Sequence, residues 1–380
     1  MKIGIEGQRL FRQKKHGMDF VALELVQNLM AIDNENEYYV FVKPGPDKCL
    51  KSSGNFHIIE LDGGSYPQWE QLALPQAAKK YNCDLLHCTS NTGPIFCSVP
   101  LVVTVHDIFY LETVSLFRQG YSAYQKFGNM YRRYVVPAVV KRAKKIITVS
   151  HSEKKRIADY FNIHDNRLTV VYNGVSTRFV PVTNQVELIR IKETYKLPDR
   201  FIFLLGNTDP KKNTRGVLKA YANFISESPD PMKLVIADFP EANLSEILVQ
   251  EGIQNIRENI IRLDYIYNPD LPAIFTMCSQ FLYPSFWESF GIPILEAMAC
   301  GAPVITSDVF AMPEIAGDAA LLINPKQPAA MALAMRRLAE DPNLVEELRE
   351  KGRLQSTRFS WRKMAGDYLE IYREILSSGH

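Results

Sequence analysis

The sequence predicts an α/β protein made of two doubly wound domains, each a parallel sheet between helices. Its length of 380 residues is long for one domain and fits two of about 180 residues each. Short apolar runs alternate with amphipathic helical patterns along the chain, as in parallel sheets with helical crossovers. A proline-bounded stretch, 181–198, has the pattern of a connection with a short helix. We therefore predict domains at 1–180 and 199–359.

The elements follow in order from these patterns. In the first domain, apolar runs predict strands at 2–6, 38–42, 57–61, 84–88, 101–105, 145–150 and 168–172. Helices are expected from Phe20 and over 68–80, and Ser152 is expected to cap a third helix. In the second domain, strands are expected at 201–205, 232–237, 260–265, 281–283 and 304–306, with helices at 214–224, 269–278, 329–339, 344–351 and 361–376. Ligands of such sheets bind beyond the carboxyl ends of the strands.

Composition excludes several classes of protein. A hydrophobic content of 46% with 23% charged residues is typical of soluble globular proteins, and a net charge of +2 predicts no nucleic-acid partner. No apolar run is long enough to span a membrane, and the amino terminus lacks a signal-peptide pattern. The six cysteines form no CxxC pair, which favours a reduced, cytoplasmic protein without a zinc site.

The stretch 281–308 carries two carboxylates and organises the second domain. Gly291 and the proline two residues later mark a helix start, because proline is tolerated in a first turn. Glu288 is thus expected in the loop before this helix, and Glu296 about one turn inside it. The first N–H groups of the helix would then be free to bind an anion such as a diphosphate. They belong to Phe290, Gly291 and Ile292. The plain alternative is a capped helix with two solvated glutamates.

The frame around these carboxylates, PSFWESFGIPILEAMACGAPVI, resembles the EX7E motif of retaining glycosyltransferases of family 4, which have the GT-B fold. The resemblance implies two Rossmann-like domains facing a cleft, the first binding the acceptor and the second a nucleotide sugar. A C-terminal helix, 360–380, would cross back to the first domain. It also implies that Glu296 holds the ribose hydroxyls and Glu288 contacts the donor sugar. Ser289 and the three residues after it would bind the donor phosphates.

Further motifs carry the same resemblance. VTVHDIFYLE is similar to the family's TxHD element, whose histidine approaches the donor sugar, and it points to His106. A lone histidine beside an aspartate is otherwise more often structural. Gly17 matches the first glycine of a donor-binding loop, although Met18 and Asp19 follow where a second glycine is often found.

The run GNTDPKKN is similar to the family's GTxxPRKN element. Lys212 then matches the phosphate-binding lysine, and we expect its ammonium to be exposed without ligand. Asn207 stands where many members have arginine, so Lys211 would supply a second positive charge. The alternative is that these lysines only confer solubility.

A basic stretch from 113 to 152 contains no acidic residue. It is either a solvated helical face or a surface for anionic lipid or a phosphate-bearing acceptor. Its basic residues are Arg118, Lys126, Arg132, Arg133, Lys141, Arg142, Lys144 and Lys145, interleaved with Tyr121, Tyr124, Phe127, Tyr131 and Tyr134.

Together these patterns predict a retaining glycosyltransferase. It would move a hexose, with mannose from GDP-mannose favoured over UDP-hexose, to a hydroxyl of a glycan or lipid-linked acceptor in cell-surface polysaccharide synthesis. His106, Glu288 and Lys212 are the expected catalytic residues. No DxD triplet occurs, so neither metal nor cofactor is expected. The protein would be cytoplasmic, with a peripheral contact to anionic membrane. The alternatives are a nucleotide-sugar epimerase and a non-catalytic binding protein; a dinucleotide oxidoreductase is disfavoured, since GxGxxG is absent.

Overall fold

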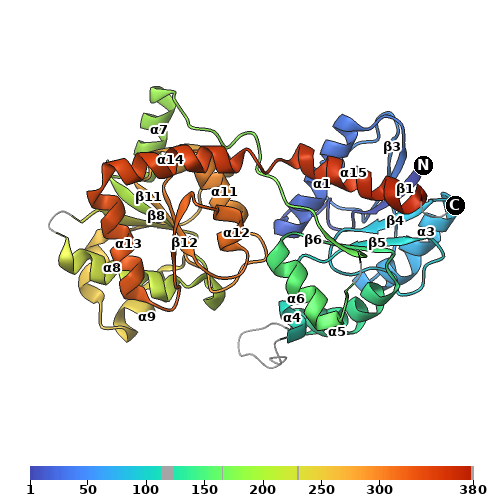
Figure 1. The fold of residues 1–380 in the computed structure, drawn as a ribbon, viewed down its shortest axis with the longest axis horizontal. Helices are drawn as coiled ribbons and strands as arrows, with labels where there is room; N and C mark the ends of the chain where they lie inside the picture. The colour runs from blue at the N-terminus through green and yellow to red at the C-terminus, as the bar shows by residue number, and fades with distance from the viewer. Residues whose placement is uncertain (113–122, 165, 229–230, 378–380) are drawn as a thin grey trace. The chain divides into compact units, whose positions relative to one another are not determined.

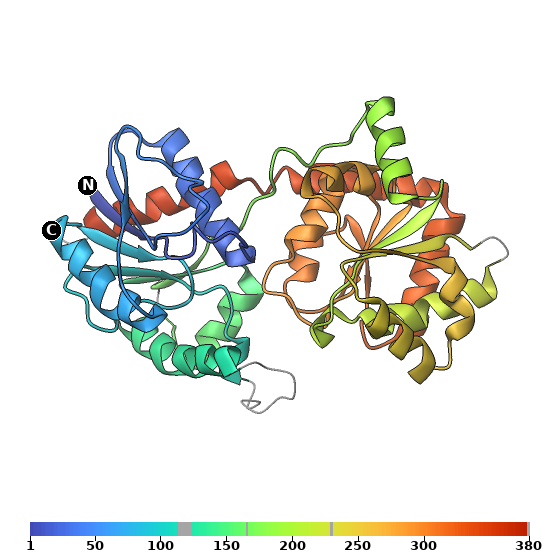
Figure 2. The same ribbon diagram turned by 180° about the vertical axis from the view of Figure 1, so that it is seen from behind.

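The computed structural model describes residues 1–380 except 113–122, 165, 229–230 and 378–380 (Figure 1). The chain forms two compact units: Met1–Gly174 with Trp361–His380, and Val175–Ser360. Each unit is a parallel sheet with helices packed on it (Figures 1 and 2). Among the described residues, no helix is both long and apolar enough to cross a lipid bilayer.

The first unit contains a seven-stranded sheet in the order β3-β2-β1-β4-β5-β6-β7. Every neighbouring pair is parallel, so the carboxyl ends of all seven strands lie at one edge. The strands are β1 (Lys2–Glu6), β2 (Glu37–Val42), β3 (Phe56–Glu60), β4 (Leu85–Cys88), β5 (Leu101–Thr104), β6 (Lys145–Thr148) and β7 (Leu168–Val170).

Polar side chains set the starts of α1 and α6 in the first unit. Asp19 accepts a hydrogen bond from the His16 N–H at 2.9 Å, so α1 starts three residues before the predicted Phe20. Ser152 was the wrong cap for α6, because the Ser150 hydroxyl accepts from the Glu153 N–H at 3.1 Å. The helices are α1 (Gly17–Ile32), α2 (Tyr66–Gln68), a π turn (Trp69–Ala73), α3 (Leu74–Lys80), α4 (Phe109–Glu112), α5 (Ala123–Arg142), α6 (His151–Phe161) and α15 (Trp361–Ser377).

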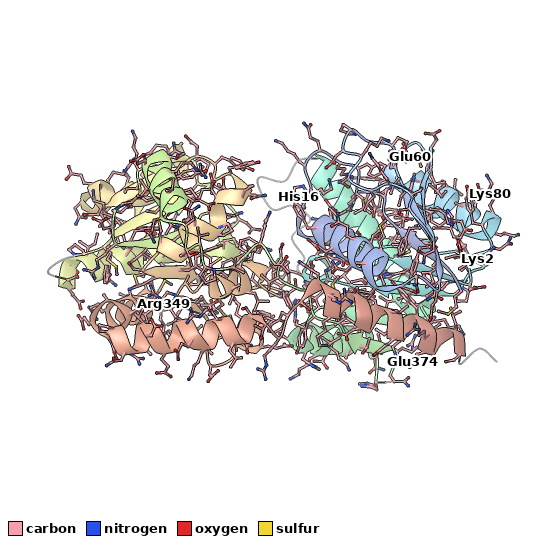
Figure 3. All side chains as sticks on the ribbon, turned by 90° about the horizontal axis from the view of Figure 1, so that it is seen from above. Lys2, His16, Glu60, Lys80, Arg349 and Glu374 are labelled. Carbon is pink, nitrogen blue, oxygen red and sulfur yellow. The ribbon has the colours of Figure 1, made fainter. Side chains whose placement is uncertain are left out.

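Helix α15 belongs to the first unit although it ends the chain. Its buried stripe packs beside α1, and its tyrosines reach the sheet. The Tyr368 hydroxyl lies 2.9 Å from the Thr104 hydroxyl, and the Tyr372 hydroxyl lies 2.7 Å from His87 Nδ1. Burial lowers the pKa of His87 to about 3, so this histidine is a neutral structural partner. Glu374, labelled in Figure 3, pairs with Lys145 at 3.2 Å.

The second unit contains a six-stranded parallel sheet in the order β10-β9-β8-β11-β12-β13. Alternate side chains of its strands fill two cores, one on each face. The strands are β8 (Phe201–Leu205), β9 (Lys233–Ala237), β10 (Ile260–Leu263), β11 (Gln280–Tyr283), β12 (Val304–Ser307) and β13 (Ala320–Ile323). The helices are α7 (Gln185–Tyr195), α8 (Thr214–Glu227), α9 (Glu241–Gln250), α10 (Leu271–Met277), α11 (Ile292–Ala299), α12 (Met312–Ala316), α13 (Pro328–Glu340) and α14 (Pro342–Ser356), with 3-10 turns at Pro210–Lys212, Gln254–Asn259 and Asn268–Asp270.

The boundary between the units differs from the predicted one. The first unit ends at Gly174 rather than 180, and the predicted connection 181–198 lies in the second unit. The reason is packing: α7 buries Ile191 in the core that also holds Phe179 and Phe275. The sequence prediction also omitted β13, a four-residue apolar strand at the edge of the sheet that is mostly half-exposed.

Candidate active site

The candidate site of the second unit lies where two neighbouring strands end. Strands β8 and β11 pair in parallel, so the turn after β8 and the loop after β11 meet at the carboxyl edge of the sheet. Lys212, in the turn, places its Nζ 2.5 Å from Glu288 Oε1 in the loop. The same ammonium donates to the hydroxyl of Tyr283 at 2.7 Å. Lys212 therefore forms one cluster with Tyr283 and Glu288, although they follow it by 71 and 76 positions in the chain.

This cluster contradicts the expectation that the Lys212 ammonium is exposed. The side chains of Lys212 and Glu288 are only 21% and 11% exposed. A carboxylate removed from water to this extent needs a partner, and the lysine provides the positive charge. Burial, and then the charge of Glu288, raise the pKa of Tyr283 well above its ordinary value, so its hydroxyl stays protonated.

The backbone of the lysine turn is fixed from both sides. Asn213 adopts the left-handed conformation with φ +58°, which ends the short turn and opens α8. Its amide donates to the carbonyl of Pro284 at 3.1 Å and to that of Pro325 at 2.8 Å. A Cβ at Gly216 would lie 2.2 Å from the Asn213 side-chain oxygen. The turn, the loop after β11 and the segment after β13 are thus held together around one amide.

Glycine is required at the start of α11. Gly291 has φ +103°, and a Cβ there would lie 3.1 Å from Ile294 Cδ1. The helix then begins at Ile292, as the sequence predicts, with Glu288 in the preceding loop and Glu296 inside the helix. In a helix the first N–H groups have no partner within the helix, so this end offers donors at the same sheet edge.

Glu296 has an unusual acidity. Burial raises the pKa of its carboxyl to about 7, and the positive charge of Arg178 opposes this shift. The charges of Glu288 and Glu296 both contribute to raising the pKa of Tyr283, so the tyrosine lies near both carboxylates. Near neutral pH, Glu296 is therefore poised between its protonated and charged forms, and ligand hydroxyls that donate to it would favour the charge.

The neighbours of Lys212 have separate roles. The ammonium of Lys211 lies 4.8 Å from the centre of the Trp287 ring, a cation–π contact. Asn207, where many family members have arginine, accepts from the Asp209 N–H at 2.7 Å and so shapes the turn. In this geometry Lys211 is directed to an aromatic face, while Lys212 is directed to the carboxylate.

His106 and Gly17 belong to the first unit. His106 follows β5, is 5% exposed, and has its Nε2 2.9 Å from the carbonyl oxygen of Thr89. A carbonyl only accepts, so Nε2 carries the proton and Nδ1 is the acceptor. Burial lowers the pKa of His106 to about 4, so the ring is neutral at pH 7. Its backbone N–H donates to the Asn91 side chain at 2.6 Å.

Gly17 is the first residue of α1, and a Cβ there would meet no atom within 4 Å. Nothing in the local backbone therefore demands glycine at this position. The neighbouring Asp19 is buried, with one carboxylate oxygen 3.9 Å from Arg9. His16, which precedes the helix, is labelled in Figure 3.

Two family models match this chain, one in each half. The model of glycosyltransferase family 4 matches residues 16–179, and the model described as glycosyl transferases group 1 matches residues 185–355. Both models describe glycosyltransferases, so each half of the chain is similar to that class of enzyme. The second match covers the Lys212–Glu288 cluster and α11, and the first covers His106 and Gly17.

Individual proteins are similar over different lengths. The chain is 32% identical over 235 residues to the O-antigen chain mannosyltransferase B of Escherichia coli, a match that spans 61% of each chain. It is 29% identical over 280 residues to the serotype-specific mannosyltransferase WbdA of the same organism, spanning 73% of this chain and 34% of the relative. This chain thus spans between about a third and three fifths of the length of these two relatives.

Solved structures share the fold. HepE of Anabaena, solved in complex with UDP-glucose, superposes with a TM-score of 0.73 over 98% of this chain and 100% of the other, at 17% identity. At that identity the likeness establishes the fold alone. The two parallel sheets and the superposition identify the GT-B fold that the sequence predicts.

Several residues of the site were missed by sequence reasoning. Tyr283 and Arg178 gave no motif signal, although Tyr283 ends a strand at the ligand-binding edge of the sheet. Asn213 lies within the GNTDPKKN run, but no role was predicted for it. In the first unit, Glu153 is a further example. Its carboxylate accepts the N–H of Ile108, two residues after His106, at 3.0 Å, and burial raises its pKa to about 7. Glu153 therefore holds the backbone of the His106 segment.

The basic stretch resolves into residues of different kinds. Arg118 and Tyr121 lie outside the described residues, and the side chains of Tyr124 and Lys126 are not described. The prediction that Lys145 belongs to an exposed basic surface is wrong. This lysine lies on β6, is only 8% exposed and forms an ion pair with Glu374. Tyr131 turns inward, whereas Lys141, Arg142 and Lys144 are exposed.

Proposed function

We propose that this protein is a retaining glycosyltransferase that moves a hexose from a nucleoside diphosphate to a hydroxyl of a glycan or lipid-linked acceptor in cell-surface polysaccharide synthesis. The observation that carries the proposal is the cluster of Lys212, Tyr283 and Glu288 at the carboxyl edge of the second sheet, beside the start of α11. The two family-model matches support it, since both models describe glycosyltransferases.

The chemical task is to stabilise the departing diphosphate while positive charge develops at the anomeric carbon. In this proposal, the Lys212 ammonium and the N–H groups of residues 289–292 bind the diphosphate. Glu296 binds the ribose hydroxyls, and Glu288 contacts the donor sugar. Donor binding would then give Lys212 a second anionic partner, so its attraction to the diphosphate grows as the glycosidic bond breaks.

His106 is proposed to approach the donor sugar as a neutral ring. Its Nε2 proton is held by the Thr89 carbonyl, which leaves Nδ1 as an acceptor for a sugar hydroxyl. The leaving phosphate, rather than a protein base, takes the proton of the acceptor in a displacement on one face of the sugar. Retention is tested by NMR of the first-formed product: the donor's anomeric configuration is expected, and an inverted linkage would exclude this mechanism.

We infer that no metal ion assists the transfer, since the sequence contains no DxD triplet and the cluster supplies a cation of its own. Activity should therefore persist in EDTA. Complete loss on chelation, with recovery on adding Mg²⁺, would contradict the inference.

Mannose is the proposed sugar, with GDP-mannose ahead of a UDP-hexose. The support is the likeness to two mannosyltransferases of Escherichia coli, while HepE, solved with UDP-glucose, keeps a UDP-sugar as the second candidate. Thermal stabilisation by GDP, UDP and ADP in parallel tests the nucleotide. A ligand present at a hundred times its Kd adds about 2.7 kcal/mol of stability. Stabilisation by ADP alone would reject both candidates.

Turnover separates this proposal from its alternatives. A nucleotide-sugar epimerase would convert the donor without acceptor, and a binding protein would leave it intact. Release of nucleoside diphosphate that depends on added acceptor is the expected result.

We further propose that α5 contacts an anionic lipid surface. Phe127, Met130 and Tyr134 are 50%, 56% and 73% exposed and recur at helical spacing along one stripe. Lys141 follows two helical repeats later, and Arg142 lies 5.6 Å from the ring centre of Phe96, which is 78% exposed. Exposed aromatic residues beside basic ones favour the interface of an anionic membrane.

A further inference from the structure

The first unit contains a cavity of about 450 Å³ that the proposed donor chemistry does not use. It lies beyond the carboxyl ends of β1 and β2, the edge where parallel sheets bind ligands. The loop after β1, the start of α2 and the middle of α5 line it. A volume of this size is within the range of small-molecule sites, roughly 300–1,000 Å³, and suits one sugar ring with a substituent.

One wall of the cavity holds a buried amide without partners. Gln8 is 4% exposed, and within the described part of the chain both its Oε1 and its Nε2 lack a hydrogen-bond partner. A buried amide left in this state costs about 1–3 kcal/mol, so it calls for a ligand that supplies both a donor and an acceptor. A sugar hydroxyl does both.

Another part of the cavity lining is aromatic and rigid. The rings of Tyr66 and Tyr131 are 5.6 Å apart at 87°, an edge-to-face pair. Both hydroxyls donate to the buried carboxylate of Glu70, at 3.0 Å from Tyr66 and 2.5 Å from Tyr131. Burial raises the pKa of Glu70, while these hydrogen bonds oppose the shift. The ring faces are therefore held in place before any ligand arrives, which reduces the entropic cost of binding.

The cavity is also strongly cationic. Arg9, Arg12, Lys43 and Arg132 line it, and none of its described lining residues is acidic. Arg9 has a carboxylate neighbour in Asp19 at 3.9 Å. Arg12, Lys43 and Arg132 form no ion pair with a carboxylate among the residues that the structure describes. Three uncompensated cations around one small cavity favour an anionic ligand, and guanidinium forks match phosphate oxygens in particular.

From this geometry we propose that the cavity binds the acceptor as a sugar that carries a phosphate group. The sugar ring lies against Tyr66 and Tyr131, its hydroxyls satisfy Gln8, and the phosphate lies among Arg12, Lys43 and Arg132. The inference rests on the proposed function and specifies the chemical class of its acceptor. The charge of Arg9 is among the causes that lower the pKa of His106, so the cavity wall lies close to that catalytic candidate.

Calorimetric titration of the full chain tests the ligand class. Glucose 6-phosphate is the soluble probe, glucose and glucuronate are its matched controls, and glucose joined to a short polyprenyl diphosphate is the lipid-linked probe. At least one phosphate probe is expected to bind about tenfold more tightly than glucose and glucuronate. Tighter binding of glucose 6-phosphate would indicate a soluble acceptor, and tighter binding of the polyprenyl-linked probe would indicate a lipid-linked acceptor. Equal binding of glucose, glucuronate and both phosphate probes would overturn the proposal.

Two variants locate the binding. Arg12→Gln removes a charge and breaks none of the described side-chain contacts, and it should weaken the phosphate probe at least about fivefold. Lys14→Gln, an exposed lysine of the same loop that does not line the cavity, should change affinity less than about twofold. Gln8→Leu should fold as well as the parent, because the buried amide is unsatisfied, yet should bind the probe more weakly. Unchanged affinity in both Arg12→Gln and Gln8→Leu would overturn the assignment.

The same preparations separate this inference from the proposed function. Stabilisation by GDP or UDP depends on the second unit, whereas acceptor-dependent turnover requires the donor site and the acceptor site together. Suppose that neither nucleotide stabilisation nor turnover is observed, while a phosphate probe binds and Arg12→Gln weakens that binding. The proposed transferase function is then refuted, and the assignment of a phosphorylated sugar to the cavity stands. If nucleotide binding and turnover hold while no phosphate probe binds, the cavity assignment alone is refuted.

Discussion

Replacing Lys212 by alanine should impair both folding and turnover, because the ammonium is the positive partner of Glu288 in the absence of ligand. Breaking a fully buried pair by removing one partner costs about 3–5 kcal/mol. Here the two side chains are 21% and 11% exposed, and the Tyr283 hydroxyl remains to donate to the carboxylate. The expected loss is therefore smaller, about 1–2 kcal/mol. In a unit of this size that corresponds to a melting temperature lower by roughly 2–8 °C.

The decisive measurement is a double-mutant cycle read by urea or thermal unfolding. Glu288→Gln removes the charge that Lys212 neutralises, so Lys212→Ala should cost much less stability in the Glu288→Gln background. The expected coupling between the two changes is about 1–2 kcal/mol. Lys211→Ala is the matched control: it loses only the contact with the Trp287 ring, worth at most ~1 kcal/mol, and should show no coupling to Glu288.

Turnover should follow a different pattern from stability. Losing one preorganised partner of developing charge typically costs about 10²–10³ in kcat, so Lys212→Ala should transfer sugar at least ~100-fold more slowly. The added Glu288→Gln change should restore stability without restoring this rate. Near-normal turnover of Lys212→Ala would refute the phosphate role, and a coupling below ~0.3 kcal/mol would refute the stabilising pair.

Three further outcomes are expected. Since the folded pKa of Glu296, about 7, lies above its ordinary value, the wild type loses stability from this group as pH rises from about 4.5 to 7. In urea unfolding, Glu296→Gln should gain about 2–3 kcal/mol relative to wild type across that window, and parallel pH curves would contradict the shift. Gly291→Ala should lose about 1–3 kcal/mol because of its φ of +103°, while Gly366→Ala, in α15 with no atom near its Cβ, should be neutral or stabilising. Replacing Met130 and Tyr134 by serine should weaken flotation with anionic vesicles several-fold, and unchanged flotation would return α5 to a solvated face.

The sequence predicted the local parts of this fold closely. Strands β1 and β8 begin and end where the apolar runs do, and α11 begins after Gly291 as the glycine and proline indicate. These features depend on residues close together in the chain: a short apolar run, a positive φ, a proline in a first turn. For the same reason the sequence could place Glu288 in a loop and Glu296 in a helix without any knowledge of the rest of the structure.

Local sequence patterns predicted the environment of a residue less reliably where tertiary packing determines it. Helix α7 has the composition of a connection, yet it belongs to the second unit because Ile191 has a core to enter. Lys145 is one of several basic residues in sequence, but its place on β6 buries it against Glu374. In both cases a partner distant in sequence determines the environment.

The sequence by itself determined the two-sheet α/β class, the turn that carries Lys212 and the carboxylates on either side of Gly291. Only the tertiary structure decided that Lys212 neutralises Glu288, that Tyr283 joins them, and that Gln8 faces a cationic cavity. The physical reason is that charge compensation and burial depend on which loops meet at a sheet edge. Lys212 and Glu288 are 76 residues apart, and the strand pairing of β8 with β11 brings them together.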